Sequence, residues 1–220
     1  MGVLCLVLGY SGSGKSTSLR NFSPDEVGVF NVASKPLPFR GQLPRIDAPG
    51  YEVIKQTLRA NHKRAYVIDD ANYLMAFQNF ARAKESGYAK YTDMAVDFER
   101  LLECAAKETS DDTVVFFLMH PDADDAGRVK VKTIGKMLDN QLTVEGMFPI
   151  VLLADHDDKS YYFWTRDPGC SPVKTPMGMF DAERIDNDLK AVDTAIREYW
   201  GLGKPNKPSD AGKEDGASEG

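Results

Sequence analysis

The chain alternates short apolar runs with segments that have helical periodicity. Residues Val3–Leu8 form an unbroken apolar run, which is typical of a strand buried on both faces of a parallel sheet. Similar runs predict five further strands, at residues 27–32, 65–70, 113–119, 149–155 and 160–165. The turn sequence His-Asp-Asp-Lys at 156–159 separates the last two runs, so we expect these two strands to form a hairpin.

Four segments between and after the strands have the pattern of helices. Residues 15–22 predict a short helix that ends before Pro24, because proline disfavours helical geometry in the residue before it. A second helix is expected at 51–63, and a third after Thr92, which is a suitable N-cap. Apolar residues recur at helical spacing in the third segment and in the last one: Met94, Phe98, Leu101, Leu102 and Ala105, then Leu189, Val192, Ile196 and Tyr199. This alternation predicts an α/β fold, a mostly parallel sheet flanked by helices, with a β-hairpin and a helix at the C-terminal end.

The sequence GYSGSGKST directly follows the first predicted strand. Its spacing, Gly-x-x-x-x-Gly-Lys-Ser, is that of a loop that wraps phosphate groups, since glycines let backbone N–H groups approach an anion closely. Lys15 can then reach the β- and γ-phosphates, and the Ser16 hydroxyl can bind Mg²⁺. The alternative is a glycine-rich turn with an exposed lysine. The predicted phosphate-binding residues are Gly9, Tyr10, Ser11, Gly12, Ser13, Gly14, Lys15, Ser16 and Thr17.

A pair of acidic residues ends the predicted strand at 65–70. A nucleotide-hydrolysing site of this class needs a carboxylate near the Mg²⁺, at the end of a buried strand. We expect Asp69 to hold the metal opposite Ser16, and Asp70 to orient or deprotonate the attacking water. The pair can instead cap the helix that follows, because aspartate is a favoured N-cap residue.

His120 follows the predicted strand at 113–119 and therefore faces the same edge of the sheet. It can sense the γ-phosphate through a hydrogen bond, or it can be a strand-end residue whose hydrogen bonds are satisfied locally. The segment after it carries Arg128, Lys130, Lys132 and Lys136. These cations predict a loop that contacts a single-stranded DNA backbone, a lid over the nucleotide, or a solvated charged hairpin.

Composition is that of an ordinary globular protein. The 220 residues are 42% hydrophobic and 27% charged, which allows one domain with a substantial core, expected at residues 1–202. The net charge of −6 argues against nucleic-acid binding by the whole surface. Residues 203–220 are rich in Gly, Pro, Ser and charge, and we expect them to be disordered.

Candidate metal ligands and sorting signals are sparse in the sequence. Three cysteines and three histidines are scattered without the spacing of a disulfide or zinc site, as expected in a reducing cytosol. The acidic cluster at 155–158 is interpreted as a solvated turn. No apolar stretch approaches the length that spans a bilayer, and no basic residue precedes the first apolar run, so we expect neither a membrane span nor a signal peptide.

Five segments occur in an order that points to one family: GYSGSGKSTSLRNF, NVASKPLPFRG, YVIDDANYL, FFLMH and KTPMGMFDAERIDNDLKAVDTAI. The chain resembles, from Met1 to about Trp200, small ATP-binding proteins of bacteriophages. These proteins have a RecA-like fold, are grouped with the AAA ATPases and are linked to single-strand annealing recombination. The resemblance implies a P-loop ATPase that uses ATP and Mg²⁺, acts on single-stranded DNA in the cytoplasm of a bacterial host, and forms homo-oligomers.

Carried over to this chain, the resemblance implies catalytic roles for four residues: Lys15, Asp69, Asp70 and His120. RecA-like ATPases commonly place a glutamate at the end of the second strand as the catalytic base, but this chain reads FNVASK there, without any acid. This departure shifts the role of the base to Asp70 or makes hydrolysis slow. Oligomeric relatives also supply a cation across the subunit interface, for which Arg166 and Lys174 are candidates.

Other functions stay open from the sequence. A small-molecule or nucleoside monophosphate kinase has a similar phosphate loop, but it needs several arginines to clamp the phosphate of the acceptor. Only Arg40 and Arg45 lie near the expected place. A scaffold that binds nucleotide and hydrolyses little is a third interpretation. A GTPase is disfavoured, because the chain has no Asn-Lys-x-Asp stretch to read guanine.

Overall fold

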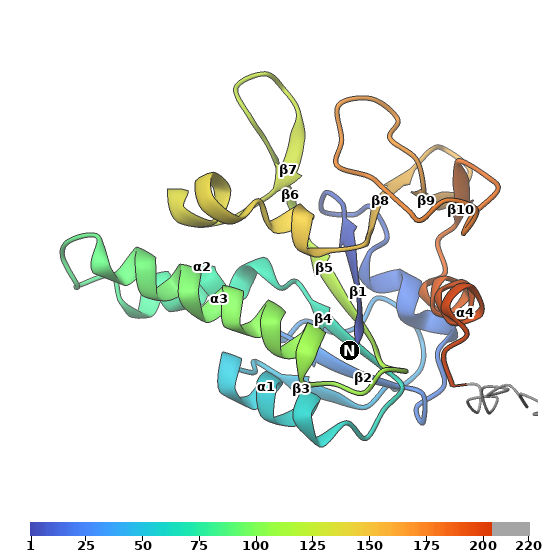
Figure 1. Cartoon of the computed structure of the whole chain (residues 1–220), viewed down its shortest axis with the longest axis horizontal. Coiled ribbons are helices and arrows are strands. Elements are labelled where there is room, and N and C mark those ends of the chain that lie inside the picture. Colours follow the sequence, from blue (N-terminus) through green and yellow to red (C-terminus); the bar gives the residue numbers. More distant parts are fainter. Residues whose placement is uncertain (204–220) are drawn as a thin grey trace, which may run out of the picture.

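A computed structural model describes residues 1–203 of the chain, except the side chain of Asp139. Its main sheet has eight strands: β1 (Val3–Leu8), β2 (Val27–Asn31), β3 (Arg45–Asp47), β4 (Ala65–Asp69), β5 (Val114–Met119), β8 (Ile150–His156), β9 (Tyr161–Trp164) and β10 (Arg184–Asp186). Six of them run parallel in the order β8-β1-β5-β4-β2-β3 (Figure 1). Strands β9 and β10 extend the sheet beyond β8 in antiparallel orientation.

This architecture confirms the predicted α/β fold with a mostly parallel sheet flanked by helices. All six predicted strands are present, and their ends lie within one residue of the expected ones. The strands β3 and β10 were not predicted, because each has only three residues and a single apolar side chain. Both are edge strands with the sequence Arg-Ile-Asp, and short charged strands protect a sheet against edge-to-edge association.

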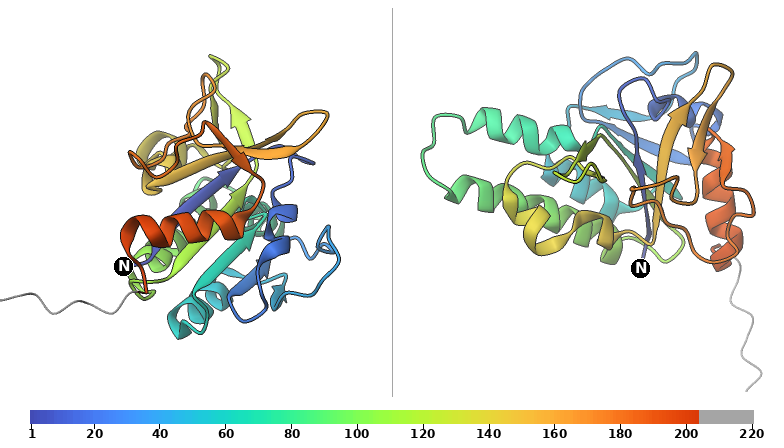
Figure 2. Two further views of the ribbon diagram at one scale, coloured as in Figure 1. Left: turned by 90° about the vertical axis from the view of Figure 1, so that its right-hand side faces the viewer. Right: turned by 90° about the horizontal axis from the view of Figure 1, so that it is seen from above.

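Helices cover both faces of the sheet (Figure 2). One face carries α1 (Tyr51–Ala60), α2 (Asn72–Ala81) and α3 (Ala89–Lys107), and the other carries the short helix η1 (Ser16–Asn21) and α4 (Leu189–Trp200). The central strand β1 shows why two layers form: Leu4, Leu6 and Leu8 belong to the core under α1 and α3, whereas Cys5 and Val7 belong to the core under α4. An unbroken apolar run therefore supplies two cores at once.

Three helices differ in detail from the expectation. The helix expected at 51–63 ends at Ala60, because Asn61 adopts the left-handed conformation. The short helix at 15–22 is a 3-10 helix that ends at Asn21, before Pro24 as predicted. Helix α3 begins at Ala89 rather than after Thr92, so the prediction that Thr92 caps it is wrong. No side chain caps this end, and the amides of Tyr91 and Thr92 bond instead to the carbonyl of Tyr88. The apolar periodicity locates the buried face of α3, but the residue buried in its first turn is Lys90, so this turn gives no apolar signal.

A second, two-stranded sheet stands above the carboxyl edge of the main sheet (Figure 1). It consists of β6 (Pro121–Ala123) and β7 (Val129–Val131), which form an antiparallel hairpin. Two short helices, η2 (Leu138–Leu142) and η3 (Val144–Met147), lead from this hairpin into β8. None of the helices within the described residues combines the length and the apolar character that crossing a bilayer requires. The predicted tail at 203–220 lies outside the described residues, apart from Gly203.

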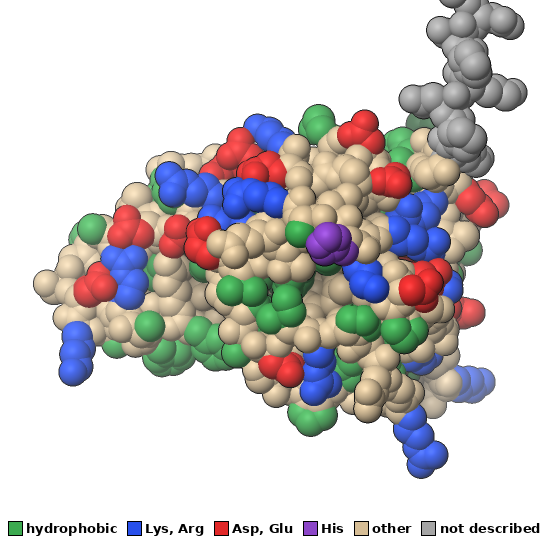
Figure 3. All heavy atoms as spheres, turned by 90° about the horizontal axis from the view of Figure 1, so that it is seen from below, with side chains coloured by type: hydrophobic (Ala, Val, Ile, Leu, Met, Phe, Trp, Pro, Cys, Tyr) green, Lys and Arg blue, Asp and Glu red, His purple; other side chains and the backbone are tan. Residues whose placement is uncertain are grey.

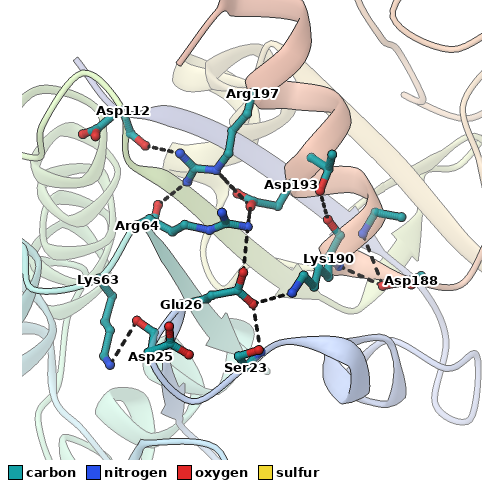
Figure 4. Close-up of polar contacts among 12 residues, drawn as sticks. Ser23, Asp25, Glu26, Lys63, Arg64, Asp112, Asp188, Lys190, Asp193 and Arg197 are labelled. Atoms are coloured by element: carbon teal, nitrogen blue, oxygen red, sulfur yellow. Dashed lines mark hydrogen bonds and ion pairs between the residues drawn. The ribbon is translucent and has the colours of Figure 1, made fainter. Parts of the chain in front are cut away.

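The amino edge of the sheet is closed by a network of charged side chains (Figure 4). The buried carboxylate of Asp193, on α4, lies 2.8 Å from Arg64 and 2.9 Å from Arg197. Arg197 also donates to the backbone carbonyl of Arg64, directly before β4 (2.6 Å). Glu26, directly before β2, pairs with Arg64 (3.2 Å) and with Lys190 of α4 (2.6 Å). These contacts fix α4 to the ends of two central strands.

The surface at this end of the molecule has no region of a single charge. Figure 3 shows the face that lies at the bottom of Figure 1, away from the carboxyl edge of the sheet. Acidic and basic side chains are interspersed there, with apolar side chains between them. Such a mixed surface is typical of a solvated face and offers no extended track for a polyanion.

We expect Asp193→Asn to lower the free energy of unfolding by about 3 kcal/mol, because it removes the carboxylate that two arginines share in a buried site. Urea unfolding measures the effect. Glu198→Gln is the matched control, since it removes the same charge from an exposed position on the same helix. Equal stability of the two variants would show that the network does not hold α4 in place.

Candidate functional site

The loop at 9–17 connects β1 to η1 at the carboxyl edge of the sheet, the upper edge in Figure 1. Lys15 in this loop is only 6% exposed, and its ammonium group donates hydrogen bonds to the carbonyl oxygens of Gly9 (2.6 Å) and Tyr10 (3.0 Å). Burial lowers the pKa of Lys15 to about 8, although the nearby Asp70 and Asp69 favour its charged form. The loop thus buries a cation beside two carboxylates.

Four consecutive backbone amides of this loop are free. Within the described residues, the N–H groups of Gly14, Lys15, Ser16 and Thr17 have no acceptor, because the first backbone bond of the short helix is donated by Ser18 to Gly14 (3.0 Å). A row of unpaired N–H groups next to a buried ammonium group attracts an anion. This part of the site can therefore bind phosphate.

Close packing explains why Gly14 has to be a glycine. Its φ is +88°, and a Cβ there would lie 2.9 Å from the Tyr161 ring and 3.1 Å from the side-chain nitrogen of Asn187. Among the described residues, the Asn187 nitrogen and the Ser13 hydroxyl are buried without a hydrogen-bond partner. Buried polar groups are normally satisfied, so these two atoms are further signs of a ligand at the loop.

The structure brings Ser16 and Asp69 together. Asp69 is the last residue of β4, and its Oδ1 accepts a hydrogen bond of 2.9 Å from the Ser16 hydroxyl. The carboxyl group is 5% exposed, and burial, followed by the charge of Asp70, raises its pKa to about 6. A carboxylate and a hydroxyl side by side are ligands that Mg²⁺ accepts.

The pKa of Asp70 is shifted in the opposite direction to that of its neighbour. Its carboxylate lies 2.7 Å from the Lys35 ammonium group and 3.2 Å from the His120 Nε2. Burial alone would raise the pKa of Asp70, but the hydrogen bonds from His120 and Lys35 lower it to about 2. The alternative that this pair caps the next helix is wrong, because Ala71 occupies the N-cap position of α2 and no side chain caps it.

Asn72, which the sequence did not single out, fixes the position of His120. Its Oδ1 accepts a hydrogen bond from the His120 amide (2.6 Å), and its Nδ2 donates to the carbonyls of His120 (3.3 Å) and Lys132 (2.6 Å). One buried side chain at the start of α2 therefore joins the end of β5 to the end of the β6–β7 hairpin.

These groups surround one cavity of 360 Å³, lined by Ser11, Gly12, Ser13, Gly14, Lys15, Ser16, Thr17, Lys35, Pro36, Pro38, Asp69, Asp70, His120 and Tyr161. Of the predicted site residues, only Gly9 and Tyr10 do not line it, and they hold Lys15 through their carbonyls. Lys35 and Tyr161 were not predicted. The prolines after Lys35 indicate a loop, but no pattern in the sequence shows that this loop folds over the site.

Arg128 and Lys130 lie on the β6–β7 hairpin, whereas Lys132 directly follows it and Lys136 lies in the segment that leads to η2, so the interpretation as a charged hairpin holds for part of this segment. The guanidinium group of Arg128 is not available as a free cation, because it pairs with Asp124 at 2.8 Å. Lys132 and Lys136 are exposed. The structure thus divides the four basic residues instead of gathering them into a single patch.

The remaining candidates lie away from the site cavity. Arg166 and Lys174 line a separate cavity in the segment after β9. The turn predicted at 155–158 is present only in part, because Asp155 and His156 belong to β8. The chain turns at 157–160, where the Asp157 carboxylate accepts the amides of Lys159 and Ser160 (both 2.9 Å). In residues 1–203, no three His, Cys, Asp or Glu side chains are grouped so that they could hold a metal ion.

A scan of the chain against models of protein families gives no match, and neither does a search of the curated proteins. The chemistry of the site therefore has to follow from its geometry.

The two neighbouring aspartates should affect stability with opposite signs. The folded pKa of Asp69 is raised above 3.8, so the ionised group costs stability as the pH rises through about 6. We expect Asp69→Asn to stabilise the ligand-free protein at pH 7 by up to about 3 kcal/mol, and the gain to disappear near pH 4.

The folded pKa of Asp70 is lowered, so its stabilising contribution is present above 3.8 and is lost as the pH falls through about 2. We expect Asp70→Asn to destabilise the protein at pH 7 by about 1 to 2 kcal/mol. Urea unfolding of both variants at pH 7 and pH 4 measures the two effects. If both substitutions changed the free energy of unfolding in the same direction at pH 7, the opposite pKa shifts of the two carboxyl groups would be contradicted.

Proposed function

We propose that the protein is a Mg²⁺-dependent P-loop ATPase of RecA-like fold that acts on single-stranded DNA in phage recombination. One observation supports the proposed nucleotide binding. The loop buries Lys15 beside four free amides, and a triphosphate would satisfy all of these hydrogen-bond donors at once. The family resemblance of the five segments supports the role in recombination, with the cytoplasm of a bacterial host as the location and a homo-oligomer as the assembly.

Ser16 and Asp69 are the residues that would hold Mg²⁺. This ion is usually bound through one or two carboxylates together with substrate phosphates, and the hydroxyl and carboxylate oxygens already lie 2.9 Å apart. When bound, Mg²⁺ neutralises charge on the phosphate oxygens. The raised pKa of Asp69 supports this assignment, because a carboxylate in a buried site without a cation retains its proton more readily.

Three side chains are available to act on the terminal phosphate. Lys15 binds the β- and γ-phosphate oxygens, and His120 senses the γ-phosphate by donating a hydrogen bond. Asp70 orients the attacking water. Because its pKa is about 2, Asp70 is a weak base, and we expect slow hydrolysis until a second ligand rearranges its contacts with Lys35 and His120.

No observation favours the kinase alternative. No arginine lines the site cavity within the described residues. Arg40 is exposed, and Arg45 pairs with Asp47 at 3.2 Å on the edge strand β3. Transfer of a phosphoryl group to a nucleoside monophosphate needs arginines that clamp the phosphate of the acceptor. Hydrolysis of ATP therefore fits this site better than a kinase reaction.

Lys15→Ala should weaken ATP binding by about ten-fold to a hundred-fold and abolish turnover, because it removes the charge-assisted hydrogen bonds to the phosphates. Binding of a fluorescent ATP analogue and release of phosphate, with and without single-stranded DNA, measure the two effects. Lys107→Ala is the matched control, since this lysine is exposed on α3 and pairs with Glu103, away from the site.

A Lys15→Ala protein that binds and hydrolyses ATP like the parent would refute the site assignment. ATP turnover that single-stranded DNA does not stimulate, together with no binding of that DNA, would refute the role in recombination but leave the nucleotide site intact. Phosphorylation of a nucleoside monophosphate in a coupled assay would establish the kinase instead.

A further inference from the structure

A second cavity lies directly beyond His120. It has a volume of 410 Å³, and its lining consists of Tyr10, Asn72, Tyr73, Ala76, His120, Pro121, Lys132 and Ile134. His120 lines both this cavity and the phosphate cavity, so the two share a wall. The size is within the range of about 300–1,000 Å³ that is usual for small-molecule sites.

The walls of this second cavity combine aromatic surface with positive charge. The Tyr10 side chain is 60% exposed, and Tyr73 packs edge-on against His120, with ring centroids 6.1 Å apart. Lys132 is exposed and belongs to the lining, which includes no carboxylate among the described residues. The Lys35 ammonium group lies over the Tyr73 ring, 5.0 Å from its centroid, so a planar ring stacks on the other face of Tyr73 or on Tyr10. The Lys132 cation attracts a negative charge. A nucleotide, which is a planar base joined to a phosphate, has both features.

We propose that the second cavity binds one nucleotide unit of a single-stranded polynucleotide, with the base on the tyrosine rings and the phosphodiester near Lys132. The proposal rests on the ATPase function proposed above. A polynucleotide fits better than a free nucleoside monophosphate, because a phosphodiester carries one negative charge and a phosphomonoester carries nearly two at neutral pH. One lysine without an arginine matches the single charge.

The hydrogen bonds of Asn72 connect the second cavity to the phosphate cavity. The side chain bonds to the backbone of His120 on one side and to the carbonyl of Lys132 on the other. His120 in turn contacts Asp70 through Nε2. A base that enters beside Asn72 and Tyr73 therefore acts on the residues that face the γ-phosphate, and binding of the strand changes the rate of ATP hydrolysis.

Photo-cross-linking locates the base directly. Oligothymidylate with one 5-iododeoxyuridine is irradiated with the full-length protein without ATP, and the modified peptide is identified by mass spectrometry. We expect the cross-link at Tyr10 or Tyr73. Because this measurement needs no nucleotide, it distinguishes a failure of the second cavity from a failure of the ATP site.

The variant Ala76→Glu introduces a carboxylate into the cavity from α2, where glutamate is a good helix former. It should weaken the binding of fluorescent oligothymidylate by about ten-fold or more and remove the DNA-dependent increase in ATP turnover, measured as the ratio of rates with and without DNA. Ala81→Glu, at the exposed end of the same helix, is the matched control and should behave like the parent.

Cross-links outside the cavity, or an Ala76→Glu protein that binds the oligonucleotide like the parent, would overturn the proposal while the ATP site stands. Phosphate transfer to deoxythymidine monophosphate that Ala76→Glu blocks would also overturn it, because the cavity would then hold the acceptor of a kinase. Absence of ATP binding by the parent protein, with the cross-link still at Tyr10 or Tyr73, would overturn the ATPase but not the base site.

Discussion

Two lysines and two aspartates balance one another's charge at the carboxyl edge of the sheet, and the rest of the site depends on that balance. Lys15 and Asp69 are buried. Burial lowers the pKa of Lys15 and raises the pKa of Asp69, and both shifts favour the neutral form of the side chain. Asp70 stays ionised because Lys35 and His120 contact it. The proposed triphosphate would add negative charge to a set that is already balanced, so a divalent cation would have to enter with it. The same set of residues would then account for both proposed sites, one for the anion and one for the cation.

The two edges of the sheet use charge in different ways. At the amino edge, Asp193 is buried between Arg64 and Arg197, and the network of Figure 4 ties α4 to the sheet. At the carboxyl edge, backbone amides of the loop and the side chains of Ser13 and Asn187 keep unsatisfied polar atoms. Arg64 Nε in the amino-edge network also lacks a hydrogen-bond partner, so a single such atom does not mark a ligand site. At the carboxyl edge the unsatisfied atoms lie beside a row of free amides and a buried ammonium group, and this combination favours a ligand there. The site and the structural clamp lie at opposite ends of the same strands.

Much of the fold and most of the residues that line the site were predictable because they depend on local patterns. Apolar runs located six strands, since a buried strand needs continuous apolar residues whatever surrounds it. Glycine and lysine spacing located the phosphate loop, and strand ends located Asp69 and His120. Lys35, Asn72 and Tyr161 were missed, because each makes its contact through one side chain with a residue that is distant in sequence. A contact made by a single side chain leaves no periodicity or motif in the sequence.

The sequence by itself determined the α/β class, the glycine-rich loop directly after the first strand, and the acidic pair at the end of another strand. These follow from the spacing of residues within single segments, where local geometry limits what the chain can do. Only the tertiary structure decided that β5 lies between β1 and β4. This order puts His120, at the end of β5, between the loop after β1 and the acidic pair at the end of β4. It also decided that Lys35 neutralises Asp70 and that a second cavity shares the His120 wall. These contacts depend on which segments, distant in sequence, pack together. That packing is determined by the hydrophobic core as a whole.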